Sequence, residues 1–202
     1  MRFTRTNNEI IDDNTEDKAL VRLVSEGRED ALNVLMGRYK HKLFAFISRY
    51  VKDEDAAYDI LQETFIRLNF KAETYSPAYK FSTWLYQIAI NLCRDWGRKQ
   101  KVRQFLSLDN VVNEESSSTY HDMLSDPRSN VEDIADTRQQ LKILEREIQK
   151  LPHKLKTALI LFAVEGNSQE VCAELLNVTP KTVETRVYRA RKILAEKLAK
   201  NF

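Results

Sequence analysis

Apolar side chains recur every three or four residues along the first hundred positions, which is the spacing of one face of an α-helix. The clearest stripe runs over Glu29–Val51, and a shorter one precedes it over Asp17–Ser25. A third helix is expected after Asp53 and a fourth after Ser82, because short polar side chains can cap the free N–H groups of a first turn. The pattern predicts an N-terminal domain of four helices.

A second pattern, over residues 166–198, predicts two helices joined by a tight turn. Ser168 can cap the first helix, and Thr179 can cap the second, with Pro180 at its first position. Asn177 stands where the turn needs a left-handed backbone, which Asn tolerates better than most residues. The side chains of the first helix that we expect to point inward are Val171, Cys172, Leu175 and Leu176.

The second helix of this pair has two distinct faces. Its apolar face carries Val183, Val187, Ala190, Leu194 and Leu198. Its other face carries Lys181, Thr182, Thr185, Arg186, Arg189 and Lys192. Over residues 178–202, seven Lys or Arg residues stand against two Glu. A solvated helical hairpin fits the periodicity alone, but the capped turn and the charge favour a helix-turn-helix whose second helix enters the DNA major groove.

The segment 104–136 differs from both neighbours in charge. It holds eight acidic residues and one basic residue, with several serines and few large apolar side chains. Such a composition predicts little structure of its own. We therefore predict an all-α protein with an N-terminal extension (1–16), a four-helix domain (17–103), a flexible acidic linker (104–136) and a helix-turn-helix domain (137–202).

Aromatic and basic side chains gather in and after the loop before the predicted fourth helix. Tyr75, Tyr79, Phe81 and Trp84 lie within ten positions, with Lys80 among them. The basic residues toward the end of that helix are Arg94, Arg98, Lys99, Lys101 and Arg103, against Asp95. Aromatic rings and cations suit single-stranded nucleic acid, whose bases stack while its phosphates meet positive charge. We expect Phe81 and Trp84 to fill the core, which leaves Tyr75 and Tyr79 as stacking candidates.

Composition excludes several classes of protein. The 202-residue chain has four Gly and four Pro, and no apolar run long enough to span a bilayer. Its N-terminus lacks the apolar core of a signal peptide, so we expect a cytoplasmic protein. His41, His121 and His153 offer no metal-ligand spacing, and Cys93 and Cys172 are expected to be buried apolar side chains. Without a phosphate loop or a nucleophile–base pair, we expect neither an enzyme nor a cofactor.

Several segments together resemble one protein family. FSTWLYQIAINLCRDWGRK (81–99) is similar to the signature of conserved region 2 in bacterial extracytoplasmic-function (ECF, group 4) sigma factors of the sigma-70 family. DAAYDILQETFIRL (55–68) resembles the preceding helix of that region. DPRSNVED (126–133) resembles the stretch that usually opens the second domain, and the helix-turn-helix resembles region 4. The ordered set covers the chain from about residue 17 to residue 198.

The resemblance implies a promoter-specificity subunit that binds core RNA polymerase, recognises the −35 and −10 promoter elements and opens the DNA. It implies a surface for the clamp helices of the largest polymerase subunit at Asp59, Gln62 and Glu63. It implies −10 recognition and melting by Tyr75, Tyr79, Lys80, Asn91, Arg94, Arg98 and Lys99. The outer face of the helix-turn-helix would read the −35 element. Such proteins are commonly held inactive by an anti-sigma factor, which is an expected partner.

Two other interpretations compete with this one. A stand-alone helix-turn-helix regulator would explain the basic helix but neither the segment 55–68 nor the aromatic loop. A decoy that imitates a sigma factor to titrate its anti-sigma partner would not need the two basic faces that the chain carries.

Overall fold

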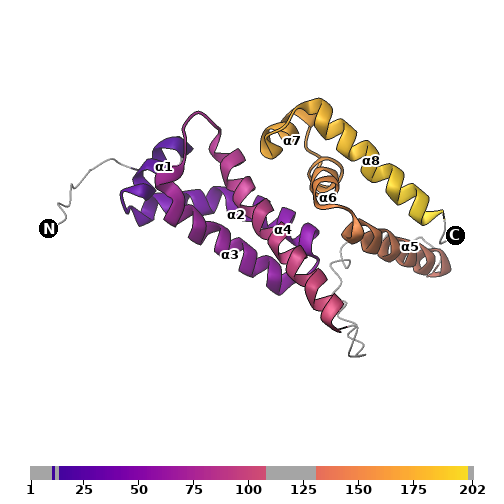
Figure 1. Ribbon diagram of the computed structural model, residues 1–202. Helices are drawn as coiled ribbons and strands as arrows, with labels where there is room; N and C mark the ends of the chain where they lie inside the picture. Colours follow the sequence, from indigo (N-terminus) through magenta and orange to yellow (C-terminus); the bar gives the residue numbers. More distant parts are fainter. Residues whose placement is uncertain (1–10, 12–13, 108–130, 200–202) are drawn as a thin grey trace.

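The computed structural model describes residues 11, 14–107 and 131–199, and the regular elements there are all helical (Figure 1). The N-terminal domain contains α1 (Asp17–Ser25), α2 (Glu29–Val51), α3 (Glu54–Lys71), a short 3-10 turn (Ala72–Thr74) and α4 (Phe81–Ser107). The C-terminal domain contains α5 (Val131–Lys150), α6 (His153–Leu159), the π-helical turn Ile160–Val164, α7 (Gln169–Leu176) and α8 (Pro180–Leu198). The predicted all-α class with two helical domains is confirmed.

Helix α2 is the centre of the N-terminal domain, since it packs against α1, α3 and α4. Its completely buried side chains include Leu35, Leu43, Phe46 and Ile47. Burying a large apolar side chain contributes about 1.5–3 kcal/mol relative to leaving it exposed. This shared core fixes the directions in which the outer faces of α3 and α4 point.

The junction between α2 and α3 is set by local backbone chemistry. Lys52 adopts a left-handed conformation (φ 57°), which ends α2. Asp53 then caps α3, because its carboxylate accepts a hydrogen bond from the Ala56 N–H at 2.9 Å. The predicted cap and the predicted starts of α2 and α3 are confirmed.

The capping role predicted for Ser82 is wrong, because α4 begins one residue earlier, at Phe81. Phe81 is only 3% exposed and packs edge-on against Tyr39, with ring centroids 5.2 Å apart. This packing holds Phe81 in the first turn, where the Trp84 N–H donates to the Lys80 carbonyl. Tertiary packing, not a local cap, therefore sets the start of α4.

The turn between α7 and α8 has the predicted local structure. The hydroxyls of Ser168 and Thr179 accept hydrogen bonds from backbone N–H groups of α7 and α8. Asn177 is left-handed, with φ 51°. Val171, however, is 42% exposed, so the inward orientation predicted for it is wrong. It stands one residue, or about 100° of helix rotation, before the buried Cys172, so it lies at the margin of the buried face of α7.

Two helices extend into the segment predicted to be a linker. Residues 104–107 continue α4 and residues 131–136 begin α5. A composition rich in polar and charged residues does not by itself exclude a helix. The rest of that segment, 108–130, lies outside the described residues, as do 1–10 and 12–13 of the predicted N-terminal extension.

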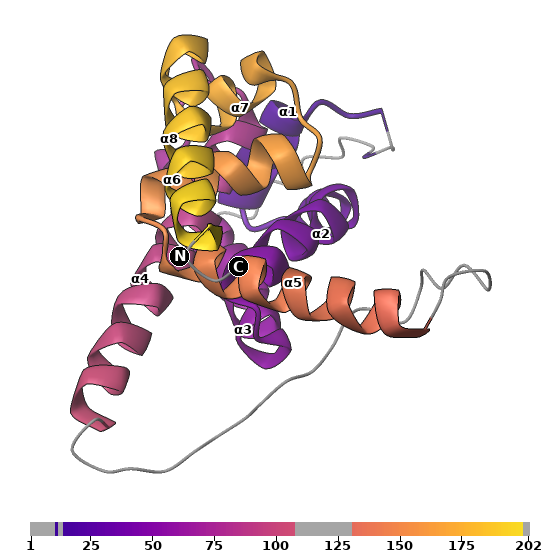
Figure 2. The same cartoon turned by 90° about the vertical axis from the view of Figure 1, so that its right-hand side faces the viewer.

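The C-terminal domain lies against the N-terminal domain, with α7 packed on α4. Figures 1 and 2 show α8 on the outer side, with α6 between it and the N-terminal domain. Among residues 11, 14–107 and 131–199, no helix has both the length and the apolar composition that crossing a membrane requires.

The left-handed turn residue gives a test of the fold. Replacing Asn177 by Val should destabilise the protein by roughly 1–2 kcal/mol, because a β-branched residue is strained at positive φ. Asn177→Gly is the matched control, and it should change the free energy of unfolding little or not at all, because Gly adopts positive φ without strain. Urea unfolding followed by circular dichroism measures both. Equal stability of the two variants would contradict the left-handed turn.

Candidate nucleic-acid and polymerase surfaces

The outer face of α8 carries the residues predicted to read duplex DNA. Lys181, Arg189 and Lys192 are exposed, whereas Thr182, Thr185 and Arg186 are half-buried. The opposite face is closed by Val183, Val187, Ala190 and Leu194, which are all buried against the rest of the domain. The predicted division of α8 into a buried and an open basic face is therefore present.

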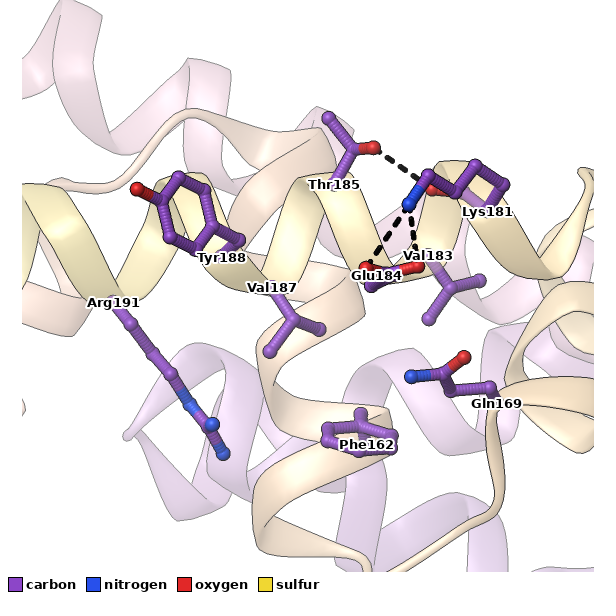
Figure 3. Close-up of a pocket in the computed structure, with 9 residues that line it drawn as sticks. All are labelled: Phe162, Gln169, Lys181, Val183, Glu184, Thr185, Val187, Tyr188 and Arg191. Carbon is purple, nitrogen blue, oxygen red and sulfur yellow. Dashed lines mark hydrogen bonds and ion pairs between the residues drawn. The ribbon is translucent and has the colours of Figure 1, made fainter.

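The first turn of α8 is ordered by its own side chains. The Lys181 Nζ lies 3.0 Å from a carboxylate oxygen of Glu184, and the Thr185 hydroxyl donates to the Lys181 carbonyl at 2.8 Å (Figure 3). Pro180 has no N–H group, and the N–H groups of Thr182 and Val183 donate to Thr179. The positive potential that this helix end offers to a phosphate therefore comes from the helix dipole and from the exposed Lys181.

A cleft of about 420 Å³ lies beside the outer face of α8. Phe162 of the π-helical turn and Gln169 of α7 line it from the opposite side, and Arg191 extends from α8 toward Phe162 (Figure 3). Tyr188, which is 68% exposed, stands at its edge. The sequence analysis counted Arg191 in the basic excess but did not assign Arg191 or Tyr188 to a surface, because both fall between the two predicted faces.

The two loop tyrosines predicted to stack on bases differ in the structure. Tyr75 is half-buried, and its ring packs against Phe81 and Trp84 at centroid distances of 6.0 and 5.4 Å. Its hydroxyl donates to the Tyr79 carbonyl at 2.7 Å. Tyr79 is 58% exposed. The core roles predicted for Phe81 and Trp84 are confirmed, and Tyr75 supports the loop while Tyr79 presents an open ring.

The basic residues of α4 form a stripe that becomes more exposed toward the end of the helix. Asn91 is half-buried, whereas Arg94, Arg98 and Lys99 are exposed. Arg98 donates to Asp95 at 2.6 Å, and this hydrogen bond lowers the pKa of the Asp95 carboxyl. Asp95 thus orients the arginine while leaving a net positive surface.

The outer face of α3 combines polar and apolar side chains. Asp59 and Gln62 are exposed, and Glu63 is half-buried and paired with Arg67 at 2.7 Å. The large apolar side chains Tyr58, Ile66 and Phe70 are 48%, 49% and 81% exposed. Sequence analysis missed these three as surface residues, although Ile66 and Phe70 fall outside the buried stripe of α3. Such an apolar patch with a polar rim is typical of a protein–protein contact.

Neither cysteine is available for chemistry. Cys93 and Cys172 are both buried and unpaired, as predicted. Burial raises the pKa of Cys93 to about 12 and that of Cys172 to about 11, so both remain thiols at neutral pH. In the described part of the chain, His, Cys, Asp and Glu side chains form no group of three or more that could hold a metal ion.

Comparison with known proteins decides the family. Residues 35–103 match the family described as Sigma-70 region 2, and residues 141–194 match Sigma-70, region 4. The chain is 31% identical over 192 residues to the ECF RNA polymerase sigma-E factor of Haemophilus influenzae, covering 90% of this chain and 95% of that protein. It is 32% identical over 181 residues to the ECF RNA polymerase sigma factor SigW of Bacillus subtilis, covering 90% and 96%. The chain belongs to the ECF sigma factors.

Two solved structures share the fold of this sigma factor. CnrH, in complex with the cytosolic domain of CnrY, has a TM-score of 0.59 at 22% identity, covering 92% of this chain and 99% of that chain. The sigma factor RpoE of Bartonella quintana, in complex with the anti-sigma factor NepR, has a TM-score of 0.53 at 24% identity, covering 78% and 90%.

The family assignment confirms the resemblance seen in the sequence. The protein is a sigma subunit that directs transcription initiation, and sigma factors recognise promoters rather than catalyse a reaction. This function is favoured over the stand-alone regulator and over the decoy.

A polar contact joins the two domains of the sigma factor beside α4. The Tyr50 hydroxyl of α2 lies 2.7 Å from Nδ1 of His153 at the start of α6. Lys156, one turn further along α6, is buried, with its Nζ 4.0 Å from the centroid of the Tyr50 ring. Its Nζ also donates to Oε1 of Gln149 at 2.5 Å. Burial lowers the pKa of Lys156 to about 8.

His153 is held in its neutral form in this contact. Burial, followed by nearby positive charge, lowers its pKa to about 4. The charged and titratable groups that face it are Tyr50 of α2, Arg94 and Asp95 of α4, Lys156 of α6 and Arg186 of α8. Among these, the Asp95 carboxylate acts in the opposite direction and raises the pKa.

The lowered pKa of His153 predicts acid sensitivity. In the unfolded chain, His153 takes up a proton below its ordinary pKa of about 6.5, whereas in the native structure it does so only near pH 4. The free energy of unfolding therefore decreases as the pH is lowered from about 6.5 to about 4. Between pH 7 and pH 5, His153→Gln should lose about 1 kcal/mol less unfolding free energy than the native chain, after allowing for solvent screening. Urea unfolding at both pH values measures the difference. Identical losses would contradict the neutral, buried state of His153.

Proposed function

We propose that this sigma factor divides promoter recognition between α8 and the loop–α4 unit. The open basic face of α8 would read the −35 element in the major groove, through Lys181, Thr182, Thr185, Arg186, Arg189 and Lys192. The observation that carries this assignment is the opposite burial of the two faces, since Val183 and Ala190 are completely buried while Lys181 and Arg189 are exposed. A helix fixed by one face presents its other face in a constant orientation.

The −10 element would be opened and held by the aromatic loop and α4. The exposed Tyr79 ring offers a stacking surface for an unpaired base, and Tyr75 supports it through the hydrogen bond to its carbonyl. Lys80, Asn91, Arg94, Arg98 and Lys99 would contact the strand.

The outer face of α3 would bind core RNA polymerase. Asp59, Gln62 and Glu63 supply polar contacts to the clamp helices of the largest subunit, and the exposed Ile66 and Phe70 supply apolar area beside them. Large apolar side chains at the centre of a polar surface carry most of the binding energy in protein interfaces.

The same proposal assigns regions and partners. Residues 17–103 would act as region 2, 104–136 as the linker and 137–202 as region 4, after an extension over 1–16. The protein would act in the cytoplasm, where polymerase and DNA meet. An anti-sigma factor is a further partner, since RpoE of Bartonella quintana was solved with one.

Run-off transcription tests the proposed function directly. Core RNA polymerase would be supplied with fragmented genomic DNA of the source organism, with and without the sigma factor. Discrete transcripts that require the protein are expected, and their start sites identify the promoters. Tight binding to core polymerase without any such transcript would contradict the assignment of the two DNA surfaces.

Substitutions on α8 test the −35 surface. Arg186→Ala and Arg189→Ala should each weaken binding to a −35 duplex. Loss of a base contact costs about 1–3 kcal/mol and relaxes specificity, whereas loss of a phosphate contact lowers the salt slope by about one. Lys142→Ala removes an equal charge from the exposed surface of α5 and serves as the control. Affinity that matches the control in both arginine variants would exclude α8 as the reading helix.

Substitutions on α3 test the polymerase surface. Gln62→Ala combined with Glu63→Ala should weaken binding to core polymerase by at least about 1 kcal/mol, with helicity unchanged. Glu73→Ala, which removes the same negative charge from an exposed position outside α3, is the control. Fluorescence anisotropy of labelled protein with core polymerase measures the dissociation constants. The surface would have to be placed elsewhere if the double variant bound as tightly as the control.

A further inference from the structure

A second open side of α8 faces the cleft, and its chemistry differs from that of the basic face. Glu184, Tyr188 and Arg191 follow one another at spacings of four and three residues, so they share one side of the helix. Each comes directly after a buried residue, which turns this side by about 100° from the buried stripe. We call these three residues the cleft flank. Lys181, three residues before Glu184, lies between the cleft flank and the basic face.

The cleft flank is open to a partner. All three of its side chains are exposed, and that of Glu184 is 51% exposed although it is paired. The floor of the cleft is apolar, because Val183 and Val187 line it from α8 and the half-buried Phe162 lines it from the opposite side. The cleft therefore combines an apolar floor with a charged rim.

Glu184 is the residue that a helix made only to bind phosphates would not carry. Most charged side chains of α8 are cations, and a carboxylate among them repels the DNA backbone and weakens binding to every duplex. In the major groove, however, a carboxylate accepts a hydrogen bond from the N4 amino group of cytosine. Glu184 thus lowers affinity for the backbone and can add specificity for one base.

Lys181 and Glu184 together present a donor beside an acceptor. The Lys181 Nζ lies 3.1 and 3.0 Å from the two carboxylate oxygens of Glu184 (Figure 3). A C·G base pair offers the matching pattern, since its cytosine N4 donor stands next to the guanine O6 and N7 acceptors. The ammonium can donate to both guanine acceptors while the carboxylate accepts from cytosine. An A·T pair fits less well, because its thymine O4 has a methyl group on the side away from the donor.

Tyr188 lies one turn further along the same side. The rise from Glu184 to Tyr188 is about 6 Å, which is close to two base-pair steps of about 3.4 Å each. The Tyr188 ring is 68% exposed and can pack on the methyl group of a thymine, the one apolar group that a base edge presents in the major groove. Arg191 extends toward Phe162 instead, so we assign it no base (Figure 3).

We propose that the cleft flank belongs to the base-reading surface, with Lys181 and Glu184 selecting a C·G pair and Tyr188 selecting a thymine about two base pairs away. This inference rests on the proposed function of α8, and it names bases that α8 recognises in the −35 element. The reading surface is then wider than the basic face, and it contains a carboxylate and a ring whose contribution is specificity for particular bases.

Selection from a random duplex pool tests the assignment. The full chain is incubated with duplexes that carry about ten randomised base pairs, close to one turn of DNA, and the bound fraction is sequenced. The native chain should enrich a C·G pair at one position and a thymine about two positions away. Glu184→Gln should reduce the preference for C·G about tenfold and shift that position toward A·T, because a Gln amide pairs with adenine N6 and N7.

A matched variant separates base reading from charge. Glu196→Gln removes the same charge from an exposed position about three turns further along α8. Both Gln variants should bind a duplex without the selected site more tightly than the native chain, because each loses one negative charge. Only Glu184→Gln should change the enriched sequence, whereas Glu196→Gln should enrich the native one.

Two substitutions of Tyr188 test the second contact. Tyr188→Phe keeps the ring and should keep the thymine preference, whereas Tyr188→Ala should lose it severalfold. The C·G preference should remain in both variants. Circular dichroism should show native helicity in each, because Tyr188 is exposed and supports no core packing.

The outcomes distinguish failure of this inference from failure of the proposed function. Enrichment of a defined sequence that stays the same in Glu184→Gln and Tyr188→Ala would overturn the role of the cleft flank and leave α8 as a reading helix. A native chain that enriches no sequence, although it binds duplex DNA, would overturn the −35 assignment of α8 and this inference with it.

Discussion

Each helix surface that we propose for DNA or polymerase is the reverse of a face that the same helix buries. In α8, Val183 and Ala190 are completely buried, and the cations on the other side point outward for that reason. In α3, Leu68 is completely buried while Phe70, two residues later, is 81% exposed. The geometry of the helix links the two faces rigidly, so a change in core packing rotates the outer residues with it. Selection for a well-packed core and selection for partner recognition therefore act on the same few helices.

The two kinds of contact in the molecule differ in strength. Within each domain, helices meet through wholly buried apolar side chains such as Phe46 and Leu161. Between the domains, the cluster of buried apolar residues continues, and partly exposed ion pairs and single hydrogen bonds accompany it. Each partly exposed ion pair contributes little, so the contact between the domains depends on its apolar part as well as on its charges.

The sequence predicted best what is decided within a few residues. Asp53, Ser168, Thr179 and Asn177 have the predicted roles because a cap or a left-handed turn depends on one side chain and its adjacent backbone. The start of α4 was missed because Phe81 is held by Tyr39, more than forty positions earlier in the chain.

The candidate site shows the same limit. The basic face of α8 follows from periodicity and charge, and four of the five residues predicted for its apolar face are buried, whereas Leu198, at the end of the helix, is half-buried. No local pattern predicts the ion pairs Arg49–Glu165, Lys52–Glu145 and Lys80–Glu174, because they join residues 93 to 116 positions apart. Ile66 and Phe70 fall outside the buried stripe of α3, but an apolar residue outside one stripe can still pack against another helix, so their exposure is known only from the fold. The sequence identifies candidate recognition residues, whereas the fold is needed to show which of them other side chains cover.

The two buried cysteines have a consequence for how signals can reach this sigma factor. Oxidants and electrophiles react with thiolates, and the raised pKa values of Cys93 and Cys172 keep both sulfurs protonated beneath packed side chains. The folded chain is therefore poorly suited to sense peroxide or thiol stress by itself. A signal of that kind must reach the protein through a second molecule that binds or releases it, or through a change in the amount of the protein that the cell makes.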